Sequence, residues 1–404
     1  VRGVAWKLLK LPYGLPDEGN QWQTIIDDSI LPLGFSIIPG LPQLFKQQSA
    51  SKNPPTVLAK VTDDILLVGT DSAIASFIQN IRASFDVGRL QYHTNMTFNG
   101  AFISVGPLGF TLDIIEPLAR LRPIPIAYAR RLNPHDHITP EELTALRSLA
   151  GSLNYIGQAA CPPATYVASA IQQFIGRTSN VSILLQANAM LKELQKLPSV
   201  IHFPLADIRD SFRVVALSDA SFAPSSRYGQ TGFLLWLQPF AEPAPAAATT
   251  VASPSYLLDW SSSKQRRIAN SSLGAEILAA SLADDNLVGF AQSLASILNP
   301  HAVSSLLLLD SRSLYQLVSS FKQSGMDARL AAVVDRLRDS FMSAELGELG
   351  WIPGSAQLAD SLTKCNPMMW CLLMNAAGSA VLDIPACACF RGPSWRRTVS
   401  GGDA

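Results

Sequence analysis

The second half of the chain opens with the stretch FRVVALSD, residues 212–219, an apolar, β-prone run over 212–218 followed by a carboxylate, Asp219. Beyond it, apolar periodicity and turn residues predict, in chain order, strands at 232–237 and 256–260, a helix at 272–294, a strand at 305–309, a short helix, a helix at 328–342, and a strand and helix within 349–363. This order predicts an α/β fold in which helices flank a mixed sheet. The Pro-, Ala- and Thr-rich segment 239–254 is predicted to be a flexible hairpin loop.

Four acids stand at the strand ends and helix starts of this predicted sheet. Asp219 and Asp310 each end a strand, Glu276 lies one turn into the long helix, and Asp360 starts the last helix. Because ligands bind where the carboxyl ends of parallel strands meet, Asp219 and Asp310 are expected to face each other. Clustered carboxylates repel one another unless cations neutralise them, so the pattern predicts two Mg²⁺ or Mn²⁺ ions and phosphodiester hydrolysis. Taken singly, each acid has a strong ordinary interpretation: Asp219 could cap a turn, Glu276 could be a solvated helix residue and Asp360 could be an N-terminal helix cap.

Six segments of this region resemble, in the same order, the ribonuclease H region of copia-type retrotransposons. They are LSDASFA (217–223), GFLLWL (232–237), LDWSSSKQ (258–265), NSSLGAE (270–276), LDSRSL (309–314) and, after WIPG (351–354), QLADSLTK (357–364). The resemblance implies a ribonuclease H-like domain over 206–366 that hydrolyses the RNA strand of RNA/DNA hybrids. It also implies that the catalytic residues and ligands of both metal ions are Asp219, Glu276, Asp310 and Asp360.

The chain departs from this family beside two of the acids. Ser311 stands where many relatives carry Asn, and Gly274 and Ile277 replace the Glu and Tyr that flank the catalytic glutamate. These positions support ligands rather than bind metal, so they put catalytic efficiency in doubt and not the fold.

Four polar residues after the third predicted strand are candidates for contact with the sugar–phosphate backbone of a hybrid, which proteins recognise by shape, phosphates and 2′-hydroxyls. They are Lys264, Arg266, Arg267 and Asn270. A solvated loop is an equally good interpretation of the same residues.

The first region, 1–113, contains a predicted hairpin with strands at 57–62 and 65–68 and two adjacent acids, Asp63 and Asp64, at its turn. Adjacent acids there fit a metal site or ordinary turn chemistry. The segments WKLLKLPYGLP (6–16), VTDD (61–64) and LAGSLNY (149–155) resemble the carboxyl-side part of the reverse transcriptase of the same retrotransposons. A strand-like piece is expected near 85–88.

The resemblance implies a partial reverse-transcriptase palm over 1–113, in which Asp63 and Asp64 are a vestigial polymerase metal site. Such a site needs a third aspartate upstream. In the segment VTDD (61–64), which stands at the position of the family's polymerase box, Val61 replaces the expected tyrosine. We therefore expect a fragment of a longer polyprotein, with missing upstream domains and no polymerase activity of its own.

Two further regions complete the expected organisation. Over 114–205 a helical thumb or connection region is predicted, with a helix start signal at TPEE (139–142) and apolar residues at helical spacing after it. The C-terminal tail, 367–404, is predicted to hold a helix at 368–377 and to fray at its end.

Composition limits the remaining possibilities. The chain of 404 residues is 48% hydrophobic, which is enough to fill globular cores. It carries 31 basic and 31 acidic residues, so its net charge does not attract the whole molecule to nucleic acid. Five cysteines without paired CxxC motifs indicate a reducing setting, and no apolar run is long enough to cross a membrane. We expect an intracellular protein, cytoplasmic or nuclear; the sequence carries no signal for its oligomeric state.

Two alternatives to an active nuclease stay open. The chain could be a decayed relic that folds and binds nucleic acid without cutting it. It could also be a domesticated module whose helical region contacts a protein partner, an interpretation supported by the altered polymerase box and the neutral charge.

Overall fold

The structure is a computed structural model, and it divides into two compact units, Val1–Tyr92 and His93–Ala404. The residues that it describes are 18–47, 55–92, 94–175, 179–205, 211–222, 229–239, 250–298, 303–320, 326–343, 345–385 and 388–391. The segment WKLLKLPYGLP (6–16) lies outside them. The predicted boundaries after residues 113, 205 and 366 stay predictions.

The first unit is an antiparallel sheet of four strands in the order β1-β2-β3-β4. Its elements are α1 (Glu18–Ile30), η1 (Leu31–Leu33), β1 (Phe35–Ile38), β2 (Leu41–Gln47), β3 (Thr56–Val61), β4 (Asp64–Val68) and α2 (Asp71–Ser84). Apolar side chains from both helices and from the strands form its core, among them Ile30, Phe45 and Ile81. The predicted strand-like piece at 85–88 has no regular structure, so that expectation was wrong.

The predicted hairpin in this unit is confirmed. Val61 of β3 pairs with Asp64 of β4, which leaves Thr62 and Asp63 as a two-residue turn. Thr62 has a φ of 53°, in the left-handed region that β-branched residues avoid, and the Trp22 indole donates to its carbonyl oxygen at 2.9 Å. The turn is thus held in a conformation that glycine would adopt without steric cost.

The second unit is built on a mixed sheet of six strands in the order β12-β10-β9-β13-β14-β16. The strands are β9 (Phe212–Ser221), β10 (Gln230–Pro239), β12 (Tyr256–Lys264), β13 (Val303–Leu309), β14 (Glu348–Trp351) and β16 (Ala388–Arg391). Antiparallel pairing joins β12, β10 and β9, whereas β9, β13 and β14 are parallel. The predicted mixed sheet is confirmed.

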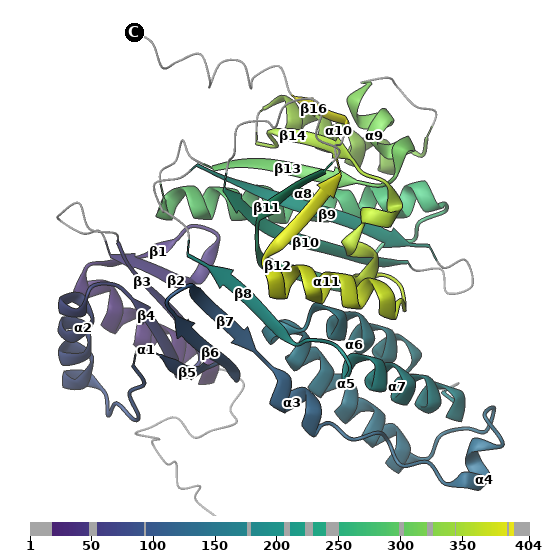
Figure 1. Ribbon diagram of the computed structural model, residues 1–404, viewed down its shortest axis with the longest axis horizontal. Coiled ribbons are helices and arrows are strands. Elements are labelled where there is room, and N and C mark those ends of the chain that lie inside the picture. Colours follow the sequence, from purple (N-terminus) through teal and green to yellow (C-terminus); the bar gives the residue numbers. More distant parts are fainter. Residues whose placement is uncertain are drawn as a thin grey trace, which may run out of the picture. The chain divides into compact units, whose positions relative to one another are not determined.

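Helices cover both faces of this sheet, as Figure 1 shows. Side chains alternate along β9: Val214 and Ala216 contribute to one core, and Val215 and Leu217 to the other. The first core is closed by α8 (Ser272–Ile297), α9 (Arg312–Ser319) and α10 (Ala328–Met342). The second is closed by α5 (Pro140–Ala160), α6 (Pro162–Phe174), α7 (Val181–Leu194), η4 (Leu358–Leu362) and α11 (Pro367–Ser379).

The helical region expected to connect two domains is therefore one of the two layers that bury the sheet. Its long helix begins at the predicted signal, where Thr139 and Glu142 form a capping box and Arg130 pairs with Glu142 at 2.9 Å. The short helices α3 (Ile115–Arg120) and α4 (Tyr128–Arg131) precede it. The region also holds a strand, β8 (Val200–Pro204), which joins β5 (Asn95–Phe98), β6 (Ala101–Gly106) and β7 (Gly109–Asp113) in an antiparallel sheet.

One expectation about a loop needs correction, and one about the tail is only partly covered by the structure. The end of the Pro- and Ala-rich insertion is not a flexible loop, because β11 (Thr250–Pro254) pairs with β15 (Val381–Pro385); residues 240–249 lie outside the described chain. The helix predicted in the tail is confirmed as α11, and further along β16 pairs with β14 and satisfies the backbone groups of that edge; residues 392–404, where fraying was predicted, lie outside the described chain. Both pairings join segments far apart in sequence, which local patterns do not reveal.

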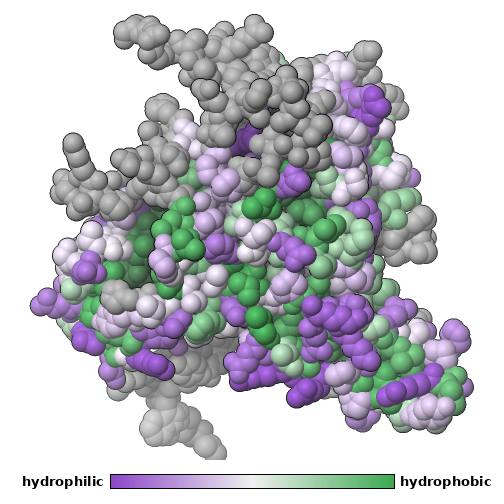
Figure 2. Space-filling view, viewed as in Figure 1, coloured by the Kyte–Doolittle hydropathy of each residue, from purple (hydrophilic) through white to green (hydrophobic). Residues whose placement is uncertain are grey.

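Among the described helices, none is both long enough and apolar enough to cross a membrane. On the face seen in Figure 2, hydrophobic and hydrophilic residues are interspersed.

The Thr62→Gly variant is expected to stabilise the first unit by about 1 kcal/mol, because glycine removes the penalty of a side chain in the left-handed region. Urea denaturation of the full chain would measure the change. As a control, Thr97→Gly in β5 should destabilise the protein, since glycine gains nothing in a regular strand. A Thr62→Gly variant less stable than the parent would contradict the assigned turn.

Candidate metal centre

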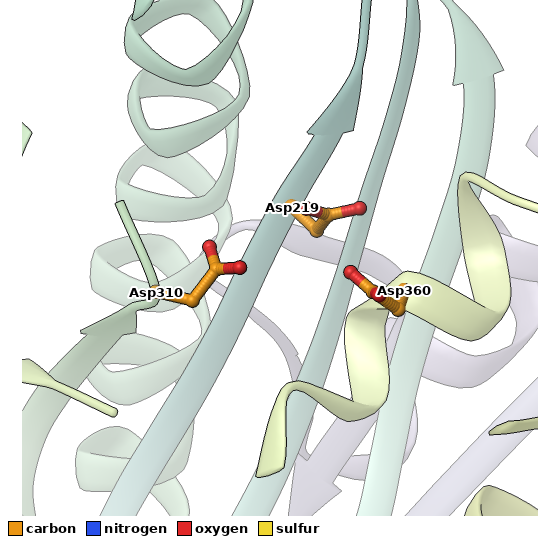
Figure 3. Close-up of side chains that lie close together, drawn as sticks. All are labelled: Asp219, Asp310 and Asp360. Carbon is orange, nitrogen blue, oxygen red and sulfur yellow. The ribbon is translucent and has the colours of Figure 1, made fainter. Parts of the chain in front are cut away.

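Three of the predicted acids lie together. Asp219, Asp310 and Asp360 each offer a carboxylate oxygen, and these atoms lie within 4.8 Å of one another. Figure 3 shows the three carboxylates converging from separate elements. Asp219 lies on β9, and Asp310 follows β13, whose Leu309 pairs in parallel with Ser218. The parallel register therefore brings Asp219 and Asp310 to the same level of the sheet, as expected.

Asp360 reaches the cluster from a short 3-10 helix, η4, and not from the start of the last helix as predicted. Gln357, which is fully buried, holds the beginning of this turn by donating to the carbonyl oxygen of Ser218 at 2.9 Å. The Trp370 indole holds its end by donating to the carbonyl oxygen of Ser361 at 3.0 Å. The sequence pattern could not distinguish this single turn from the first turn of an α-helix.

Close packing against β10 also fixes η4. Gly232 pairs with Asp219 across the strands, and a Cβ atom added there would lie 2.7 Å from Leu362 Cβ and 2.9 Å from Thr363 Cγ2. Only glycine lets the turn that carries Asp360 lie directly on the sheet.

A chain of hydrogen-bonded polar groups, of which Gln230 is buried, links η4 to the helical layer. Gln173 of α6 donates to Gln230 of β10 at 2.7 Å, and Gln230 donates to the Ser262 hydroxyl at 2.7 Å. Ser262 in turn donates to the carbonyl oxygen of Leu362 at 2.5 Å. The layer formed by residues 140–194 thus supports the element that delivers the third acid.

Burial and mutual repulsion shape the charges of the cluster. Asp219 is only 1% exposed, and burial, followed by the charge of Asp360, raises its pKa to about 7. The same two causes raise the pKa of Asp310. Without a cation, proton binding is therefore favoured at carboxylates that would otherwise be charged.

Glu276, the fourth predicted acid, is not one of the three grouped residues, although it lies close enough to feel their charge. Burial, then Asp219 and Asp310, raise its pKa to about 9. It sits on α8, whose first turn is capped by Ser271 through the backbone N–H of Gly274.

Two residues at the centre were missed by the sequence interpretation. The Thr363 hydroxyl donates to Asp219, and the Lys364 ammonium lies 2.8 Å from Asp360 Oδ1 and 3.5 Å from Asp219 Oδ2. The i,i+4 spacing of Asp360 and Lys364 was the available signal. An ammonium held by the carboxylate oxygens is a stand-in for a cation, and hard oxygen donors suit Mg²⁺ or Mn²⁺, so the residues fit a divalent ion.

The predicted backbone contacts lie outside this cluster. Lys264 ends β12, and Arg266, Arg267 and Asn270 are exposed in the segment before α8. Gln265 between them is buried and donates to the carbonyl oxygen of Ala275 at 2.9 Å, which ties the segment to the helix. Contact with nucleic acid stays a prediction for these four residues.

In the first unit, Asp63 and Asp64 are exposed at the hairpin turn. Within the described residues, the one group of three or more potential metal-ligating side chains is that of Asp219, Asp310 and Asp360. The neighbouring Lys60 is buried, forms an ion pair with Asp27 and lies 5.1 Å from the centre of the Phe45 ring. The assignment of a polymerase palm, and of a vestigial metal site within it, stays a prediction.

No model of a known protein family matches the sequence, and no curated protein matches it. The chain is similar to the solved N-terminal RNase H domain of a Mycobacterium tuberculosis protein fused to maltose binding protein, with 16% identity and a TM-score of 0.25 over 41% of this chain and 97% of that one. It is similar to RNase H1 from the archaeon Halobacterium salinarum NRC-1, with 14% identity and a TM-score of 0.23 over 37% and 94%. It is also similar to a foamy viral protease-reverse transcriptase solved with an RNA/DNA hybrid, with 11% identity and a TM-score of 0.38 over 82% and 38%.

Without divalent ions, the protein is expected to lose stability as the pH rises from about 5 to about 9. Asp219 and Glu276 have pKa values near 7 and 9 when folded, above about 4 in the unfolded chain, so the folded state binds more protons within this window. The melting temperature in EDTA should fall by about 5 °C or more. Asp219→Asn and Glu276→Gln should each flatten this slope, and a melting temperature that rises with pH would contradict the raised pKa values.

The Gly232→Ala variant is expected to destabilise the protein by about 1–3 kcal/mol, because its methyl group would push η4 off the sheet. It should also weaken Mn²⁺ binding, measured by calorimetry, since Asp360 moves with that turn. Gly289→Ala on α8 is the matched control: no atom lies within 4 Å of the added Cβ, so stability should be unchanged or slightly higher. Equal effects of both variants would show that close packing at Gly232 is unimportant.

Proposed function

We propose that this protein is a ribonuclease H-type endonuclease that hydrolyses the RNA strand of RNA/DNA hybrids with two Mg²⁺ or Mn²⁺ ions. The observation that carries the proposal is the convergence of Asp219, Asp310 and Asp360 from two parallel strand ends and one turn. Glu276, close enough for these charges to raise its pKa, is the proposed fourth ligand. When bound, such ions activate the attacking water and stabilise the leaving oxygen.

The protein's own residues would position the reaction. Gln357 and Gly232 hold η4 against the sheet, so Asp360 is fixed before any substrate arrives. Thr363 orients the Asp219 carboxylate by hydrogen bonding. Lys264, Arg266 and Arg267, exposed beside α8, are proposed to contact the hybrid backbone together with Asn270.

We infer from the sequence motifs that the chain derives from a copia-type retrotransposon polyprotein and carries the carboxyl-side part of a reverse transcriptase before the nuclease. An intracellular setting, cytoplasmic or nuclear, is proposed on the cysteine pattern.

A relic that binds hybrids without cutting them is the second candidate. It is favoured by one observation on the sequence, the replacement of family residues beside the catalytic glutamate at Gly274 and Ile277. The intact and converging aspartates favour the active enzyme.

Cleavage of a labelled RNA/DNA hybrid in Mg²⁺ should fall at least about 100-fold in Asp219→Asn and Asp310→Asn, because each removes an anionic ligand and with it a few kcal/mol of transition-state stabilisation. Asp335→Asn is the matched control, since this exposed residue on α10 pairs only locally with Arg338 at 3.0 Å. Double-stranded DNA and single-stranded RNA should not be cut. Cleavage that survives both active-site substitutions would sink the proposed site, whereas hybrid binding without cleavage by the parent protein would favour the relic.

A further inference from the structure

The cation that lies in the carboxylate cluster is a side chain of the protein itself. The Lys364 ammonium lies 2.8 Å from Asp360 Oδ1 and 3.5 Å from Asp219 Oδ2, two members of the group whose ligand oxygens lie within 4.8 Å of one another. A Mg²⁺ or Mn²⁺ ion would bind such oxygens at about 2.0–2.2 Å. The ammonium and the ion therefore compete for the same oxygen atoms.

The two members of the Lys364–Asp219 ion pair differ in how much each needs a charged partner. Asp219 is 1% exposed and has no solvent to stabilise its charge, whereas the Lys364 side chain is 45% exposed. The lysine can thus withdraw into water without leaving its own charge buried, while the aspartate left behind requires a replacement cation.

We propose that Lys364 is a built-in competitor of the divalent ion: it neutralises the carboxylates in the metal-free protein and must leave them when metal binds. The proposal rests on the proposed function only in assuming that the cluster binds a divalent ion. Lys364 then sets the metal concentration at which the site loads, and it keeps the fold stable before loading.

An alternative arrangement makes the opposite prediction. If Lys364 stayed between the carboxylates as an additional cation beside the metal, or held Asp360 in its ligating orientation, its removal would weaken metal binding or leave it unchanged. The effect of removing the lysine charge on metal affinity therefore decides between the two.

The test is a titration of the full chain with Mn²⁺. Binding is measured by calorimetry and, independently, by the electron paramagnetic resonance signal of free Mn²⁺. Lys364→Met should bind Mn²⁺ at least about tenfold more tightly than the parent, since the ion no longer displaces a resident charge. Lys364→Arg, which keeps the charge, should bind no more tightly than the parent. Lys196→Met is the matched control, because it removes an equally charged side chain that pairs with Glu193 on α7.

Thermal denaturation gives a second readout that a merely structural lysine would not produce. Without metal, Lys364→Met should melt below the parent, because the buried carboxylates lose their counter-ion. In saturating Mn²⁺ the variant should melt at or above the parent. If Lys364→Met does not fold without metal, Lys364→Gln, which can still hydrogen bond to Asp360, takes its place in both measurements.

The failures are distinguishable. A parent protein that binds no Mn²⁺ overturns the proposed function itself. If the parent binds Mn²⁺ and Asp219→Asn does not, the proposed metal site stands. If Lys364→Met then binds Mn²⁺ as tightly as the parent or more weakly, the proposal that Lys364 competes with the ion is overturned.

Discussion

The parallel pairing of β9 with β13 is the constraint on which the site depends. It brings Asp219 and Asp310 to one level of the sheet, although the long helix α8 separates them along the chain. Parallel neighbours require such a crossover, and the crossover helix here also carries Glu276. The pairing that orders the sheet therefore also forces acids into proximity, and the repulsion between them has to be offset by a cation, by protons or by both.

The second layer of helices is what makes this pairing possible. Strands with both faces buried need cover on each side, and on one side α5, α6 and α7, which precede the sheet in sequence, supply it together with η4 and α11. The hydrogen-bonded chain from Gln173 through Gln230 and Ser262 ends on the turn that holds Asp360. The helical layer of α5, α6 and α7 carries no candidate catalytic group, but packing and hydrogen bonds connect it to the site.

Local signals in the sequence were sufficient where structure is decided locally. The helix start at 139–142, the helix at 328–342 and the strand at 212–218 depend on neighbours a few residues apart. The structure has all three, with the strand extended to Ser221. The pairings of β11 with β15 and of β14 with β16 depend on distant segments. Alternation of apolar and polar residues along one strand does not identify the strand with which it pairs. The contact of Lys364 with Asp219 was hidden for the same reason, since it follows from how η4 lies on β10.

The order of the elements along the chain has a consequence for synthesis. A ribosome releases β9 and β13 before η4, so a nascent chain exposes Asp219 and Asp310 before Asp360, the residue that completes the cluster, has emerged. The edge of the sheet at β14 is covered later still, when β16 emerges. During translation the protein therefore passes from a sheet with an open edge and an incomplete acid cluster to a sheet whose β14 edge is paired and whose three carboxylates converge, and residues 358–391 make that change.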